Sequence, residues 1–182
     1  LSELQGAFVP AVHGISGDVI VDKRQLKVLN EYPTGSAILT SQTELSSMFL
    51  IEVARGCVRG CKFCLTGYFN RRLRLRSIDR MIAQIEEVKP LLSRVGLIAA
   101  EIACHPGIPQ LCEYLISQNL EISTSSLEID RLSQSLMELL VRGGQRTLTI
   151  APESGDEALR FGLHKRIPDE KIFHLADMAG QA

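Results

Sequence analysis

The alternation of apolar runs with helical repeats from residue 49 onward limits the chain to an α/β fold. Short, nearly continuous apolar runs are typical of parallel strands covered on both faces, and apolar residues spaced three or four apart are typical of helices. The predicted strands are 49–54, 95–102, 120–125 and 146–151, and the predicted helices are 78–88, 108–115 and 132–140.

Several residues predict where these helices begin and end. Ser77 is the expected N-cap of the first helix, and Gly143 is expected to end the third. Ser154 with Glu157 three positions later resembles a capping box that opens a fourth helix, and Pro168 begins a fifth. Strands and helices that alternate with short loops predict βαβ units and a parallel sheet. The pattern alone leaves open whether that sheet is doubly wound or closed into a barrel.

Three of the five cysteines lie within eight residues, directly after the first predicted strand. Cys57, Cys61 and Cys64 have the spacing C-x3-C-x2-C, and no fourth cysteine lies nearby. Soft sulfur ligands select zinc, copper(I) or iron–sulfur clusters. A closed four-cysteine site needs a fourth ligand. Three thiolates therefore predict a metal centre with one position open to a cofactor or substrate.

Cysteines are also often buried as small apolar side chains. This alternative fits poorly with a loop that contains Gly60 and three nearby cations, Arg55, Arg59 and Lys62. Positive charge favours the thiolate, which is the form that binds metals. Metal ligation is the better interpretation of the three clustered cysteines. Cys104 and Cys112 lie alone in the sequence, so packing is the better interpretation for them.

The motif C-x3-C-x-aromatic-C after a strand resembles the signature of radical S-adenosylmethionine (radical SAM) enzymes. The flanking segments 54–56, 66–68, 72–77 and 149–155 are similar to the Elp3/MiaB/NifB-like radical SAM core, especially to members found with a cobalamin-binding domain. The resemblance covers residues 49–182. It implies a partial (β/α)6 barrel, here truncated after about four βα units.

The resemblance also implies the cofactors. Cys57, Cys61 and Cys64 would bind three irons of a [4Fe–4S] cluster, and the fourth iron would chelate S-adenosylmethionine. An electron donor such as flavodoxin or ferredoxin would reduce the cluster, and cleavage of the cofactor would give methionine and a 5'-deoxyadenosyl radical. Cobalamin would enter only through a domain outside this chain, and the substrate is not identified.

Further residues are expected to contact S-adenosylmethionine because of the same resemblance. Phe63, between the last two cysteines, would pack on the adenine, and Glu153 would accept hydrogen bonds from the ribose hydroxyls. Glu101 is expected at the amino group, although Ala99-Ala100 precedes it where many members carry glycine. Ser125 and Ser154 are further expected cofactor contacts, and Ser154 has a competing role as a helix cap.

Two other functions remain open from the sequence. A non-catalytic zinc module would use the three cysteines with His105 as a candidate fourth ligand. A radical SAM enzyme that modifies RNA would use the arginine run of residues 71–76, although such runs are more often solvated or paired with local anions.

Composition adds few constraints. The 182 residues are 45% apolar and 23% charged with a net charge of -1, which is ordinary for a globular domain and argues neither for nor against a polyanionic partner. No apolar run approaches the roughly 20 residues that span a bilayer. Clustered cysteines without a secretory signal predict a reducing, cytoplasmic location. Residues 1–48 are expected to be a leading segment or the tail of an upstream domain, and 49–182 a core that is incomplete at its C-terminus.

Overall fold

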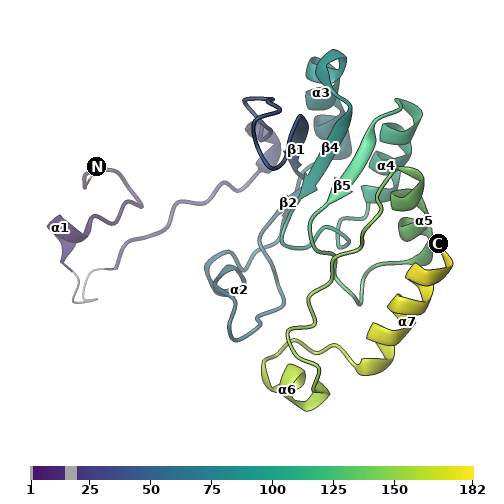
Figure 1. Cartoon of the computed structure of the whole chain (residues 1–182). Helices are drawn as coiled ribbons and strands as arrows, with labels where there is room; N and C mark the ends of the chain where they lie inside the picture. The colour runs from purple at the N-terminus through teal and green to yellow at the C-terminus, as the bar shows by residue number, and fades with distance from the viewer. Residues whose placement is uncertain (1, 15–19) are drawn as a thin grey trace.

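A computed structural model describes residues 2–14 and 20–182. At its centre is a parallel sheet of three strands, in the order β1 (Met48–Glu52), β4 (Arg94–Ile98) and β5 (Glu121–Thr124) (Figure 1). Phe49 lies opposite Val95, which in turn lies opposite Ile122. All three side chains are buried, so this register brings the apolar residues of the three strands to one face.

Helices α3 (Ile78–Val88), α4 (Ile108–Ser117) and α5 (Gln134–Arg142) cover that face (Figure 1). The predicted helices are thus confirmed, with Ser77 Oγ accepting a hydrogen bond from the Arg80 N–H at the first N-cap. Side chains such as Met81 and Leu111 are fully buried against the sheet. Each buried side chain of this size contributes about 1.5–3 kcal/mol.

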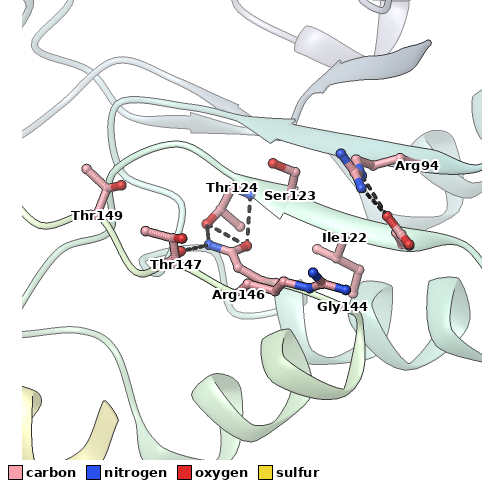
Figure 2. Close-up of a pocket in the computed structure, with 10 residues that line it drawn as sticks. Arg94, Ile122, Ser123, Thr124, Gly144, Arg146, Thr147 and Thr149 are labelled. Carbon is pink, nitrogen blue, oxygen red and sulfur yellow. Dashed lines mark hydrogen bonds and ion pairs between the residues drawn. The ribbon is translucent and has the colours of Figure 1, made fainter. Parts of the chain in front are cut away.

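The predicted fourth strand is not formed, although every residue of 146–151 is described. Residues 144–149 run beside β5 across a cavity of about 430 Å³, shown in Figure 2. The Gln145 side chain takes the place of a ladder partner, because its Oε1 accepts from the Thr124 N–H at 3.0 Å. A backbone bond from Leu127 N to Thr149 O, 2.9 Å long, joins the two segments farther on.

The first helix after this segment begins later than the sequence predicts, and the second begins where it is predicted. The N-cap of α6 (Glu157–Gly162) is Asp156, whose Oδ1 accepts from the Leu159 N–H at 2.7 Å. The capping box of Ser154 is therefore wrong; its Oγ instead accepts from the Asp156 N–H at 3.0 Å. The last helix, α7 (Asp169–Gln181), begins directly after Pro168, as predicted.

Part of the leading segment packs on the core. Leu29 in the short 3-10 helix η1 (Leu29–Glu31) is only 2% exposed, and Gly35 forms an isolated antiparallel bridge with Ile51 of β1. The short helix α1 (Pro10–His13) lies away from the sheet (Figure 1). A second 3-10 helix, η2 (Lys89–Leu91), follows α3. Among the described residues, no helix has both the length and the apolar character needed to cross a bilayer.

Candidate active site

A cavity of about 190 Å³ lies where the cysteine loop meets the segments that follow β5 and precede α7. Cys57, Cys61 and Cys64 all line it, together with Phe63 and Glu153. The remaining lining residues are Arg59, Thr66, Ala100, Ser126, Leu127, Glu128, Ile129, Ala151, Lys165 and Ile167. Residues from distant parts of the chain thus meet around the three thiols.

The cysteine loop follows β2 (Ala54–Arg55) and leads into α2 (Leu65–Phe69), and the chain then returns as β3 (Arg74–Leu75), which pairs antiparallel with β2. Gly56 makes the turn possible, since its φ is +101° and a Cβ there would lie 2.3 Å from the Arg72 carbonyl oxygen. Directly after it, the Cys57 N–H donates to the Asn70 carbonyl at 3.0 Å. The loop is therefore fastened to the residues between α2 and β3.

The three cysteines are free thiols in a largely buried setting. Burial raises the pKa of Cys57 and of Cys61, and the neighbouring cations Arg59 and Lys165 only partly oppose it. The charge of Arg59 favours both thiolates, as expected, but burial outweighs it, so that the pKa of each of these two thiols is raised. No group of three or more potential ligands in the described residues converges on a point that would suit one metal ion.

Arg59 links the cysteine loop to two acids on other segments. Its Nε lies 2.6 Å from Glu101 Oε1, and its Nη2 lies 2.7 Å from Asp130 Oδ1. The Glu101 side chain is only 2% exposed. Burial alone would raise the pKa of Asp130, but the hydrogen bonds and charge of Arg59 outweigh it and hold that pKa below its usual value. Arg59 therefore joins the cysteine loop to the segments that follow β4 and β5.

Glu128 forms the neighbouring part of the wall. Its carboxylate accepts from the backbone N–H groups of Ile102 and Ala103, at 3.0 and 2.8 Å. Burial nonetheless raises the pKa of Glu128. The carboxylate fixes the turn after β4 to the segment after β5, two chain segments that line the same cavity.

Glu153 and Lys165 also line the cavity. Lys165 Nζ donates to Glu153 Oε1 at 2.8 Å. Glu153 has a φ of +73° and His164 a φ of +59°, a region that non-glycine residues rarely adopt. Such strain gathers at functional sites, where the surrounding structure holds it in place.

Comparison with known proteins decides the family. The family model described as Radical SAM superfamily matches residues 51–182. The chain belongs to the radical SAM superfamily. It is also 38% identical over 133 residues to the uncharacterized protein MJ0966 of Methanocaldococcus jannaschii, an alignment that covers 72% of this chain and 29% of that protein. The chain thus spans less than a third of the length of this relative.

The structure brings only some of the expected radical SAM site residues together. Phe63, half exposed, and Glu153 line the cavity with the cysteines. Glu101 lies outside the lining, buried against Arg59. Ser125 is exposed after β5, and its neighbour Ser126 lines the cavity instead.

The zinc alternative for this radical SAM chain loses its expected fourth ligand. His105 is buried, with Nε2 2.7 Å from the Arg76 carbonyl and Nδ1 accepting from the Gly107 N–H. Both ring nitrogens therefore have backbone partners away from the cysteines. Cys112 lies in the core, where burial raises its pKa to about 12, and Cys104 lies outside the cavity lining. The placement of Cys112 agrees with its interpretation as a packing residue, whereas Cys104 is half-buried and its packing role stays a prediction.

Half of the arginine run turns inward. Arg76 is 1% exposed and donates to the carbonyls of Leu29, Tyr32 and Glu52 at 2.7–3.0 Å. Arg74 is also buried and donates to the Leu26 carbonyl. These two arginines hold the leading segment, so that a surface for RNA would retain only the exposed Arg71 and Arg72.

Residues that sequence reasoning missed are those whose partners are remote. Lys165, Glu128 and Asp130 carry no local motif, and their roles depend on contacts made across the cavity. The signal in the sequence for Glu128 and Asp130 is their position after the predicted strand 120–125, where ligands gather in α/β folds. Lys165 follows α6 and has no such signal.

Proposed function

We propose that this chain is the core of a radical SAM enzyme, in which Cys57, Cys61 and Cys64 hold a [4Fe–4S] cluster. The single observation that carries the proposal is that the three thiols of the C-x3-C-x2-C loop line one cavity. When bound, the cluster and S-adenosylmethionine supply one-electron chemistry that yields a 5'-deoxyadenosyl radical. The protein residues supply binding, orientation and exclusion of water.

The chemistry of the donor set supports this cofactor. Thiolates are the usual ligands of iron–sulfur clusters, and each cysteine of a cube binds a different iron. The sulfurs therefore need to surround a shared space rather than converge on one ion. A cavity of about 190 Å³ provides such a space, although it is smaller than the roughly 300–1,000 Å³ of pockets that enclose a drug-sized ligand.

The proposed cofactor contacts follow from the lining. Phe63 presents an aromatic ring beside the cysteines, which suits packing against adenine, and Glu153 offers carboxylate oxygens to ribose hydroxyls. Glu101, Ser125 and Ser154 lie outside the lining, so that we propose supporting roles for them. Glu101 fixes Arg59, and Ser154 accepts from the Asp156 N–H.

The rest of the enzyme is part of the same proposal. The three-stranded parallel sheet would belong to a (β/α)6 barrel, with the remaining strands supplied beyond the piece described. An electron donor such as flavodoxin or ferredoxin, an unidentified substrate and a reducing cytoplasmic setting complete it. The five free cysteines suit such a setting.

Anaerobic reconstitution tests this function. The loaded protein, reduced with dithionite and given S-adenosylmethionine, is expected to release 5'-deoxyadenosine and methionine in equal amounts, measured by liquid chromatography. Cys104→Ala is the matched control, because this cysteine lies outside the cavity lining. The variant should retain product formation, and Cys61→Ala should lose it. A cluster-loaded wild type that binds the cofactor without releasing either product would contradict catalysis.

A further inference from the structure

The cavity with the three cysteines contains a lysine that no sequence motif predicts. Lys165 and Cys61 line the same cavity, and the side chain of this lysine is only 17% exposed. The loop before it packs directly on the cysteine loop. The Lys62 N–H donates to the Leu163 carbonyl at 3.0 Å, and the Cys61 thiol lies 3.9 Å from the His164 carbonyl.

Buried Arg160 holds this loop in place. The residue is 0% exposed, and its guanidinium donates to the Ile167 carbonyl at 2.8 Å and to the Ser154 carbonyl at 2.9 Å, in addition to its pairing with Asp169. The Lys165 N–H in turn donates to the Arg160 carbonyl at 3.0 Å. One arginine therefore fixes the chain on both sides of the cavity wall, at residues 153–154 and at residues 165–167.

Lys165 has a single anionic partner in the described structure, Glu153, whose side chain is 36% exposed. An ammonium in a mostly buried wall is only weakly screened by water, so its charge acts strongly on neighbouring groups. Glu153 partly offsets this charge but lies nearer the solvent. The electrostatic potential at the thiols is therefore set by both Lys165 and Glu153.

We propose that Lys165 is a positioning residue that sets the reduction potential of the cluster held by Cys57, Cys61 and Cys64, with Glu153 as its counterweight. This inference rests on the proposed function. Reduction adds negative charge to the cluster, and a nearby cation stabilises the reduced form more than the oxidised form. Net charge and solvent exposure around the sulfurs are established determinants of such potentials.

The test compares potentials of reconstituted variants by redox titration followed with electron paramagnetic resonance, without S-adenosylmethionine. Lys165→Met is expected to lower the ratio of reduced to oxidised cluster about tenfold at fixed potential, equivalent to about 59 mV for one electron. Lys165→Arg should retain the wild-type potential. Glu153→Gln should shift the potential in the opposite direction, because it leaves the ammonium without its offset.

Lys62→Gln is the matched control. This lysine is adjacent to Cys61 in sequence, but its side chain is exposed and lies outside the cavity lining, so the potential should not change. Equal shifts in the Lys62 and Lys165 variants, or shifts of the same sign in Lys165→Met and Glu153→Gln, would overturn the proposal. Iron content distinguishes a failure of the proposed function from a failure of this inference. A wild type that loads no cluster overturns both the function and this inference, whereas normal loading with unchanged potentials overturns only the inference.

Discussion

Removal of the Arg59 guanidinium tests how the cysteine loop is fastened. Arg59→Met would leave Glu101, 2% exposed, as a buried carboxylate without its cation. Removing one partner of a buried ion pair costs about 3–5 kcal/mol, a large part of the 5–15 kcal/mol that stabilises a typical domain. With a urea slope of about 2 kcal/mol/M, the unfolding midpoint should fall by about 1.5–2.5 M.

The double variant Arg59→Met/Glu101→Met gives the decisive comparison. An apolar pair in place of a buried ion pair is often neutral, so the double variant should recover at least half of the lost stability. Arg94→Met is the matched control, because Arg94 pairs with Glu121 with both side chains about half exposed, and its loss should cost less than about 1 kcal/mol. Urea unfolding followed by circular dichroism measures all three. A loss of unfolding free energy below 1 kcal/mol for Arg59→Met would refute the conclusion that Arg59 fastens the cysteine loop.

Three further predictions follow from single contacts. Burial favours a raised pKa for Glu52, but hydrogen bonds and charge from Arg55, with a hydrogen bond from Arg76, hold that pKa below 4.5. The ionised Glu52 therefore stabilises the fold fully above pH 4.5, and this stabilisation is lost as the pH falls through the lower native pKa. Glu52→Gln should remove this loss from acid-unfolding curves. Gly56→Ala should cost more than about 2 kcal/mol in thermal unfolding, whereas Gly162→Ala, with open space around it, should not destabilise. Arg76→Met should speed amide exchange at 29–36, and equal protection in the variant and the wild type would count against its anchoring role.

Local patterns in the sequence predicted most of the scaffold. The apolar runs and helical repeats located β1, β4, β5 and the three helices packed on them, because these elements bury side chains at a regular period. The strand over 146–151 failed because one side chain, that of Gln145, occupies the ladder position that a backbone carbonyl would fill. The periodicity of apolar residues cannot show that a side chain takes the place of a backbone carbonyl. Ser154 failed as a cap because the helix begins two residues later, where Asp156 accepts from the Leu159 N–H, while Ser154 accepts from the N–H of Asp156 itself.

The site was predictable only where one segment carries the signal. Three cysteines on one loop are readable from spacing, and Phe63 follows from its place among them. The partners of Arg59 lie 42 and 71 residues away, and Lys165 meets the cysteine loop through a turn held by Arg160. Such contacts depend on how the whole fold closes around the cavity.

Iron loading of cysteine variants tests the central claim most directly. After anaerobic reconstitution, the wild type should contain about four irons and four sulfides per chain, with the absorption and paramagnetic signals of a [4Fe–4S] cluster. Cys57→Ser, Cys61→Ser and Cys64→Ser should each abolish this loading. Cys112→Ser is the control from the hydrophobic core and should affect stability only. One equivalent of zinc without iron in the wild type, or unchanged iron after all three replacements, would contradict the account.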